Sequence, residues 1–249
     1  MVSLLGVRLT PFDLPAAVVE METAILQTRR AYACTCPVYT LMQGHERPEV
    51  LSALNGADWV TADGMPVVWA LRTLGESAAD RVYGPDLMLA LTELSARKGY
   101  SQYYIGGEPG VADALAVEMQ GRYPGLKVAG AQCPPFRELT PEEEVAMLER
   151  INSSHADIVW VGLGSPKQDL WMAKYRSAID PPLLVGVGAA FDFFTGRQTQ
   201  APRWMQRSGT EWLFRLATNP RRLWRRYLIY NFKFLFQFGS QLASRRRYE

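Results

Sequence analysis

Short apolar segments alternate along residues 1–200 with segments whose apolar residues recur at helical spacing. In Pro85–Ala96, Leu87, Leu91 and Leu94 fall on one helical face, whereas Ile158–Gly162 (IVWVG) is apolar throughout, as a strand buried on both faces would be. The pattern predicts strands over residues 4–9, 30–35, 59–61, 101–105, 126–132, 158–162 and 183–187. It predicts helices over residues 14–26, 48–55, 66–74, 85–96, 111–123, 141–153 and 168–179. This alternation predicts an α/β fold with a largely parallel sheet.

Residues 201–249 have a different pattern, in which aromatic and basic residues interleave. The run predicts one helix from Thr210 to about Asn219-Pro220 and a second helix after it. We therefore divide the chain into an α/β domain, residues 1–200, and a basic, aromatic, helical appendage, residues 201–249.

Charge separates the same two parts. Residues 201–249 hold eleven Lys or Arg and two Glu, a net charge of +9, so residues 1–200 carry −7 of a chain total of +2. A basic segment rich in aromatic residues is typical of a helix that lies on an anionic membrane surface. The alternative is a helical pair that caps the body and leaves its arginines in solvent.

Composition narrows the class of protein. A hydrophobic share of 48% is enough for a globular core. The three cysteines, Cys34, Cys36 and Cys133, match neither a zinc pair nor a CxxC redox pair, and we expect reduced thiols in a cytosolic protein. Two histidines, His45 and His155, argue against a His-rich metal site and against a Ser-His-Asp triad. We expect neither a signal peptide nor a membrane-spanning helix.

Glycines follow several predicted strands, at Gly106, Gly162, Gly164, Gly186 and Gly188. Ligands of open parallel sheets bind beyond the carboxyl ends of the strands, where glycine lets the backbone approach a ligand closely. The segment that begins at Gly106, GGEPGVA, lacks GxGxxG spacing, so by itself it indicates only a tight turn into a helix.

Polar residues near these turns are candidates for chemistry. Asp63 lies between a strand and a helix, where it is placed either for general-base catalysis or for capping the helix. Lys167 and Gln168 follow Gly164 and would reach phosphate or sugar oxygens, unless they belong to an ordinary exposed loop. Asp192 lies among aromatic residues and alanines, where an unpaired carboxylate is costly, and this favours a role in ligand binding.

The sequence contains no Asp-x-Asp pair, on which many nucleotide-sugar transferases hold a metal ion. We therefore expect no metal, and we expect arginines and backbone N–H groups to neutralise a diphosphate. The candidates are Arg81, Arg215, Arg222 and Arg225, each of which is alternatively a solvated surface charge.

Seven blocks in order resemble the WecG/TagA/CpsF glycosyltransferases, glycosyltransferase family 26, over residues 4–236. They are CT at Cys34-Thr35, ADGMPVVWALRTLG at Ala62–Gly75, RVYGPDL at Arg81–Leu87, GGEPGVA at Gly106–Ala112, GLGSPKQDLW at Gly162–Trp171, GVGAAFDFFTG at Gly186–Gly196, and EWLFRLATNPRRLWRRYL at Glu211–Leu228.

The resemblance implies a Rossmann-like fold, with helices on both faces of the sheet, and an inverting, metal-independent enzyme without a cofactor. Such an enzyme moves N-acetylmannosamine, its uronic acid or glucose from a UDP-sugar to a polyprenyl-diphosphate-linked sugar, in the synthesis of cell-surface polysaccharide. The implied location is the cytoplasmic face of the plasma membrane, with the appendage on the lipid. We expect no nucleic-acid partner, and the chain could form a homo-oligomer.

The resemblance also implies roles for individual residues. Asp63 corresponds to the general base, and Thr35 and Arg81 to its catalytic companions. Substrate-binding positions correspond to Gln168, Asp192, Lys167, Gly106, Gly107 and Gly164, and the arginines that close over the donor diphosphate to Arg215, Arg222 and Arg225. Pro37 departs from the family's frequent Thr-x-Asn, and it removes a polar side chain and a backbone N–H.

Two other functions fit part of the sequence. A dinucleotide-dependent oxidoreductase would need GxGxxG after the first strand and an acidic residue about 20 positions later, and residues 4–9 are not followed by them. A membrane-recruited scaffold without activity would keep the fold but would not need Asp63, Arg81, Gln168 and Asp192.

Overall fold

The computed structural model describes residues 1–135 and 137–245. Its centre is a six-stranded sheet in the order β4-β3-β8-β7-β5-β6, with every neighbouring pair parallel. The strands are β3 (Ala31–Cys36), β4 (Trp59–Ala62), β5 (Ser101–Gly106), β6 (Lys127–Gln132), β7 (Ile158–Gly162) and β8 (Leu183–Gly186). The predicted parallel α/β fold is therefore confirmed.

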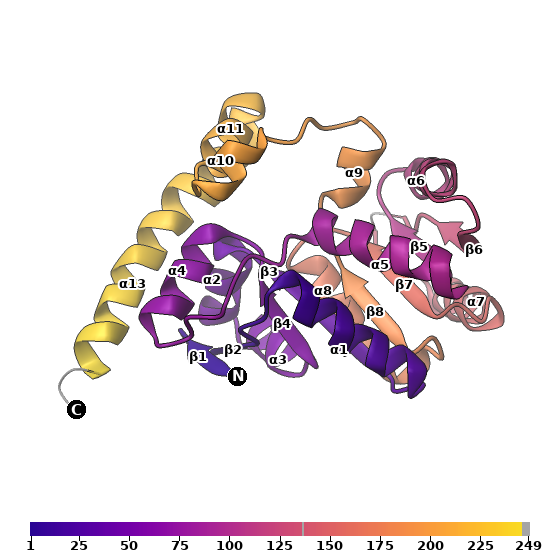
Figure 1. Ribbon diagram of the computed structural model, residues 1–249, viewed down its shortest axis with the longest axis horizontal. Coiled ribbons are helices and arrows are strands. Elements are labelled where there is room, and N and C mark those ends of the chain that lie inside the picture. The colour runs from indigo at the N-terminus through magenta and orange to yellow at the C-terminus, as the bar shows by residue number, and fades with distance from the viewer. Residues whose placement is uncertain (136, 246–249) are drawn as a thin grey trace.

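Helices cover both faces of this sheet, because strand residues alternate between two apolar cores. In β7, Ile158 and Trp160 belong to the core beneath α1 (Leu14–Leu26), α5 (Gly84–Lys98), α6 (Val111–Arg122) and α9 (Ala190–Phe194). Val159 and Val161 belong to the core on the other face. The helices there are α2 (Val38–Glu46), α3 (Pro48–Asn55), α4 (Met65–Thr73), α7 (Pro141–Ser153) and α8 (Lys167–Tyr175). Figure 1 shows α1 and α5 side by side on one face.

The predicted first strand over residues 4–9 is wrong. This segment forms an antiparallel hairpin outside the main sheet, with β1 (Val2–Leu4) paired to β2 (Val7–Leu9). Leu5 and Gly6 both have positive φ angles, 51° and 89°, which is the conformation of a tight two-residue hairpin turn. A glycine at the second position accepts this conformation without strain, and it is the local signal for the turn.

Two helical segments differ from prediction. Helix α2 was not predicted; it begins directly after Pro37 and buries Leu41 and Met42. The helix predicted over residues 168–179 ends at Tyr175 and is followed by a short 3₁₀ turn, η1 (Arg176–Ala178).

The C-terminal residues form α10 (Arg203–Arg207), α11 (Glu211–Thr218), α12 (Pro220–Trp224), a π-helical turn η2 (Arg225–Ile229) and α13 (Tyr230–Arg245). Helix α11 ends at Thr218 with Asn219 as its C-cap residue, next to the predicted end at Asn219-Pro220. Helix α13 lies against α2 on the outside of the body, and it is the long yellow helix in Figure 1.

One face of α13 packs on the body. Phe234 is buried, and the Tyr230 hydroxyl accepts a hydrogen bond of 2.9 Å from Gln43. Gln241 lies near the N-terminal hairpin, where it accepts from the Leu5 N–H at 2.8 Å and donates to Ser3 O at 3.1 Å. The appendage therefore covers the body along one helical face, and the division at residue 200 stays a prediction.

The opposite face of η2 and α13 carries apolar side chains in solvent. Together with Trp224 at the end of α12 they form what we call the apolar stripe: Trp224, Leu228, Phe232, Leu235 and Phe236, which are 40–74% exposed. Among the described residues, no helix combines the length and hydropathy that crossing a membrane requires.

Candidate functional site

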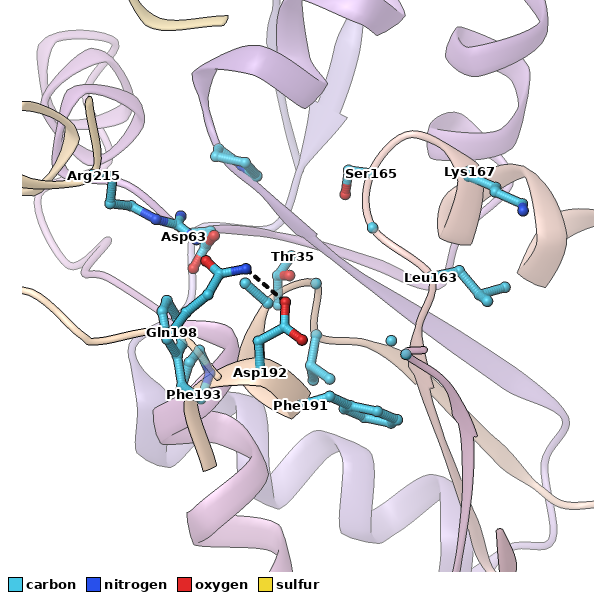
Figure 2. A pocket seen from close by; sticks show the side chains of 18 of the residues that line it. Thr35, Asp63, Leu163, Ser165, Lys167, Phe191, Asp192, Phe193, Gln198 and Arg215 are labelled. Atoms are coloured by element: carbon cyan, nitrogen blue, oxygen red, sulfur yellow. Dashed lines mark hydrogen bonds between the residues drawn. The ribbon is translucent and has the colours of Figure 1, made fainter. Parts of the chain in front are cut away.

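A cavity of about 400 Å³ lies at the carboxyl end of the sheet, where the loops after β3, β4, β5, β7 and β8 meet the C-terminal helices. This volume lies within the roughly 300–1,000 Å³ of small-molecule sites. Figure 2 shows the cavity: Asp63 and Arg215 are drawn on one side, and Leu163 and Lys167 on the other. We call it the large cavity.

Asp63 follows β4 and lines the large cavity. One carboxylate oxygen accepts a hydrogen bond of 3.1 Å from the Gly84 N–H, so the side chain is held by the start of α5 and does not cap α4. Burial raises the pKa of Asp63 above its ordinary value, and the nearby Arg81 guanidinium opposes that rise. A carboxylate with a raised pKa at the wall of a cavity is suited to accept a proton.

Arg81 holds the C-terminal helices onto the body. Its Nε donates to the backbone oxygen of Asp63 at 2.6 Å, and its guanidinium forms an ion pair with Glu211 of α11. Both side chains of that pair are 13% exposed. Arg81 also stacks on the Tyr83 ring, 3.9 Å from the ring centroid. Arg81 therefore positions Asp63 and α11, and it does not line the large cavity.

Thr35 and Gln168 join neighbouring loops of the site. The Thr35 hydroxyl lies at the end of β3 and donates to Gly186 O at 2.8 Å. Gln168 is fully buried, and its amide oxygen accepts from the Gly188 N–H at 3.0 Å. Thr35 lines the large cavity, whereas Gln168 lies behind its wall, so the geometry favours a positioning role for Gln168.

Asp192 of α9 lies in the cavity beside Gln198, whose amide donates to the carboxylate at 2.6 Å (Figure 2). The Arg197 and Gln198 N–H groups donate to the backbone oxygen of Asp192, so the segment after α9 folds back over it. Gln198 was not predicted, because nothing in its local sequence marks it as a contact of Asp192.

The predicted glycines fall in different places. Gly107 and Gly164 line the large cavity, and both have positive φ angles of 76°. Gly106 does not line it: a Cβ there would lie 2.6 Å from the Gly162 backbone, so glycine is required for strand packing. Lys167 is exposed at the start of α8 and is among the residues that line the cavity.

Three arginines line the large cavity: Arg215, Arg222 and Arg226. The guanidinium of Arg226 lies 4.6 Å from the centroid of the Tyr39 ring, and its Nε has no hydrogen-bond partner among the described residues. Burial lowers the pKa of Arg226 below the ordinary arginine value. Arg225, which sequence reasoning selected, is exposed and stacks on Trp224 at 5.2 Å. The structure therefore places Arg226, and not Arg225, at the wall of the large cavity.

A smaller cavity of about 80 Å³ adjoins the large one; we call it the second cavity. Both cavities are lined by Pro37, Asp63, Arg215 and Arg226, so these four residues separate them. Pro37, the position at which the sequence departs from the expected pattern, thus lies on the shared wall.

Within residues 1–135 and 137–245, no group of three or more His, Cys, Asp or Glu side chains is arranged to hold a metal ion. Cationic side chains and loop backbone at the strand ends are the groups available to a negatively charged ligand.

The fold and the site define an α/β protein with a polar, arginine-lined ligand site at the carboxyl edge of a parallel sheet. The chain belongs to the glycosyl transferase WecG/TagA/CpsF family, whose model matches residues 2–248. It is therefore a glycosyltransferase by family, of the kind that acts in cell-surface polysaccharide synthesis, with a sugar donor and an acceptor as its substrates.

Proposed function

We propose that the protein is an inverting, metal-independent glycosyltransferase that uses a UDP-sugar. The donor occupies the large cavity, with its diphosphate against Arg215, Arg222 and Arg226. The observation that carries this proposal is Asp63, a half-buried carboxylate with a raised pKa, in the same cavity as Arg215, Arg222 and Arg226. In-line displacement of a nucleoside diphosphate needs a base on one side of the anomeric carbon and cations at the diphosphate on the other, and the large cavity is lined by both kinds of group.

The reaction is a single in-line displacement. The Asp63 carboxylate takes the proton of an acceptor hydroxyl, and the hydroxyl oxygen forms a bond to the anomeric carbon of the donor. The bond from that carbon to the β-phosphate oxygen breaks, and the electron pair leaves with UDP. The arginines stabilise the charge that develops on the departing diphosphate, where electrostatic stabilisation contributes most.

The acceptor is a polyprenyl-diphosphate-linked sugar at the cytoplasmic face of the plasma membrane. The support is the apolar stripe, next to which the exposed Arg221 and Arg225 lie, on a chain whose residues 201–249 carry a net charge of +9. Such a surface suits the interface of an anionic bilayer. The donated sugar is N-acetylmannosamine, its uronic acid or glucose.

The test is a panel of UDP-sugars with a short-chain polyprenyl-diphosphate-sugar acceptor in EDTA, in which UDP and glycosylated lipid are measured together. Equal amounts of both products from one donor are expected, and the panel identifies the sugar. Transfer that appears only when Mg²⁺ replaces EDTA would contradict metal independence. Sedimentation with anionic vesicles but no transfer from any donor, with or without Mg²⁺, would favour an inactive scaffold.

A further inference from the structure

The chain that links α9 to α10 begins at the large cavity, and we call residues 195–201 the strap. It is the loop that leads from α9 to the C-terminal helices in Figure 1. A turn fixes its first end: Gly196 has a positive φ angle of 72°, and the Arg197 and Gln198 N–H groups donate to the backbone oxygen of Asp192 at 2.9 and 3.0 Å. Glycine adopts this φ without strain, so Gly196 lets the chain fold back over α9.

Two further contacts hold the strap against the rest of the protein. The Arg197 guanidinium forms an exposed ion pair with Glu108, which follows β5 and also lines the large cavity. At the far end of the strap, the buried Gln206 of α10 donates its amide N–H to Ala201 O at 2.8 Å. The strap is therefore fixed at both ends, beside the large cavity and at α10.

Gln198 projects from the strap into the large cavity. Its amide Nε2 donates to Oδ2 of Asp192 at 2.6 Å, and Figure 2 shows the second carboxylate oxygen of Asp192 turned away from this amide. Both side chains are half-buried. Hydrogen bonds to charged groups are stronger than those between neutral groups. The amide therefore fixes one carboxylate oxygen, and with it the direction in which the other oxygen points.

An amide is suited to this task because it orients a carboxylate without neutralising it. A guanidinium or an ammonium group at the same place would pair with the negative charge of Asp192. An aliphatic side chain would leave the carboxylate free to turn about its broad χ2 torsion. With Gln198 beside it, Asp192 keeps both its charge and its capacity to accept a hydrogen bond from a ligand.

The order of the strands indicates which part of the donor meets Asp192. Asp63 follows β4 at one edge of the sheet, and the proposed displacement places the anomeric carbon beside it. The nucleoside is on the other side of the diphosphate, toward the loops after β8, β7 and β5, which line the rest of the large cavity. Helix α9 follows β8 and carries Asp192, so this carboxylate faces the nucleoside half of the donor.

We propose that Gln198 is a positioning residue for donor binding and that it acts through Asp192. The strap holds the Gln198 amide against Asp192, and the amide holds the carboxylate in the orientation that binds the nucleoside part of the donor. This inference rests on the proposed function, because it assumes that the donor occupies the large cavity. It extends the donor site to the segment between the α/β body and the C-terminal helices.

The test is a double-mutant cycle in the full chain, made with Gln198→Ala, Asp192→Ala and the variant that combines them. UDP affinity is measured by calorimetry, so no reading depends on turnover, and thermal unfolding of each variant confirms that it folds. Gln198→Ala is expected to weaken UDP binding about tenfold. In the Asp192→Ala background it should have no further effect, because its partner is already gone. Thr199→Ala, at the exposed next position of the strap, is the matched control and should bind UDP as wild type does.

Gln198→Glu separates positioning from a merely structural role. The new side chain has nearly the same shape, but two carboxylates at hydrogen-bond distance do not both ionise readily, so they share a proton at low pH and repel each other at high pH. UDP affinity, relative to wild type at the same pH, should therefore be nearly restored at about pH 5.5 and reduced at about pH 8. A contact that only supported the fold would change the melting temperature and leave this ratio independent of pH.

A Gln198→Ala variant that binds UDP as wild type does would overturn the assignment. So would an Asp192→Ala variant with wild-type UDP affinity, equal losses from Gln198→Ala in the two backgrounds, or a Gln198→Glu variant whose relative affinity is the same at both pH values. Failure of the proposed function has a different signature, because the wild-type protein itself would then not bind UDP.

Discussion

At the scale of single residues, Asp63 is the group on which the proposed chemistry depends. Replacing its carboxylate by an amide in Asp63→Asn removes the proton acceptor and keeps the shape, so kcat/KM should fall by roughly 10²–10⁴-fold. UDP affinity, measured by calorimetry, should stay near that of wild type. A variant that retained near-normal turnover would rule out Asp63 as the base.

The pH profile tests the same residue without a mutation. Burial raises the pKa of Asp63, and the base works only when it is deprotonated, so activity is lost as the pH falls through that raised pKa. The acid limb of kcat/KM should therefore lie above about 3.9, the pKa of an unperturbed aspartate. An acid limb at or below that value would contradict a base whose pKa is raised in the folded protein.

The structure and the family resemblance select different arginines for donor binding, Arg226 and Arg225, and kinetics can decide between them. Arg226→Gln removes a cation from the cavity wall and should raise the donor KM, whereas Arg225→Gln should have little effect, because Arg225 is exposed on Trp224. Arg221→Gln, at another exposed position, is the control for loss of charge alone. Steady-state kinetics with varied donor decide between them: a large effect at Arg225 and none at Arg226 would favour the family correspondence.

The difference between Arg225 and Arg226 shows where sequence reasoning ends. The alternation of apolar and helical segments was enough to predict the fold. The local patterns and the seven blocks selected Asp63, Thr35, Asp192 and Arg215, which the structure brings to one cavity. Which of two neighbouring arginines on a helix faces the cavity depends on how the helix packs on the body. A π-helical turn over residues 225–229 also rotates the side chains locally relative to a regular α-helix. Arg226 and Gln198 could therefore not be selected from the sequence.

At the scale of elements, the ion pair between Arg81 and Glu211 fixes α11 to the body. Glu211→Gln leaves a largely buried guanidinium without its charge partner, which is strongly destabilising in buried pairs. We expect α10 and α11 to loosen, with faster limited proteolysis near residues 195–210 and a higher donor KM through Arg215. Glu49→Gln, which removes an exposed partner of Arg47, is the control and should change neither.

A second element, the first turn of α8, buries a carboxylate beneath the site. Asp169 is fully buried on α8, and burial raises its pKa to about 7. In the unfolded chain the pKa is about 3.9, so between about pH 4 and 7 the folded state holds a proton that the unfolded state has released. The free energy of unfolding should fall across that window as pH rises, by up to about 1.4 kcal/mol per pH unit from this group.

Asp169→Asn should remove this fall, because the amide is neutral at every pH. Urea unfolding of wild type and variant at pH 5 and pH 8 measures it, with the exposed Asp113→Asn as control. Equal pH dependence in wild type and Asp169→Asn would show that Asp169 is ionised in the folded protein throughout.

The N-terminal hairpin shows why the prediction of a first strand over residues 4–9 was wrong. Residues 4–9 are apolar enough for a strand, but Leu5 and Gly6 reverse the chain, and the two short strands that result pair with each other outside the parallel sheet. Helix α2 was missed for a related reason: its polar residues Gln43 and His45 bond to Tyr230 and Leu5, so the tertiary partners that stabilise it are distant in sequence.

At the scale of the whole molecule, the appendage has two faces with different partners. The sequence left open whether it lies on a membrane or on its own body. The structure places one face of α13 on α2 and the hairpin, and leaves the apolar stripe in solvent. Packing on the body and contact with a membrane are thus compatible in a single molecule, because they use opposite faces of α13.

The stripe therefore predicts membrane binding that can be removed without unfolding the body. Phe232→Ser, Leu235→Ser and Phe236→Ser together should abolish most sedimentation with vesicles that contain phosphatidylglycerol, because burying each such side chain contributes roughly 1.5–3 kcal/mol. Val117→Ser, at an exposed apolar position of α6 outside the appendage, should sediment as wild type does. Binding should also weaken as salt rises, because the exposed arginines beside the stripe act through a screened potential. If the triple variant still sediments fully while its UDP affinity and melting temperature match wild type, another surface of the protein binds the membrane.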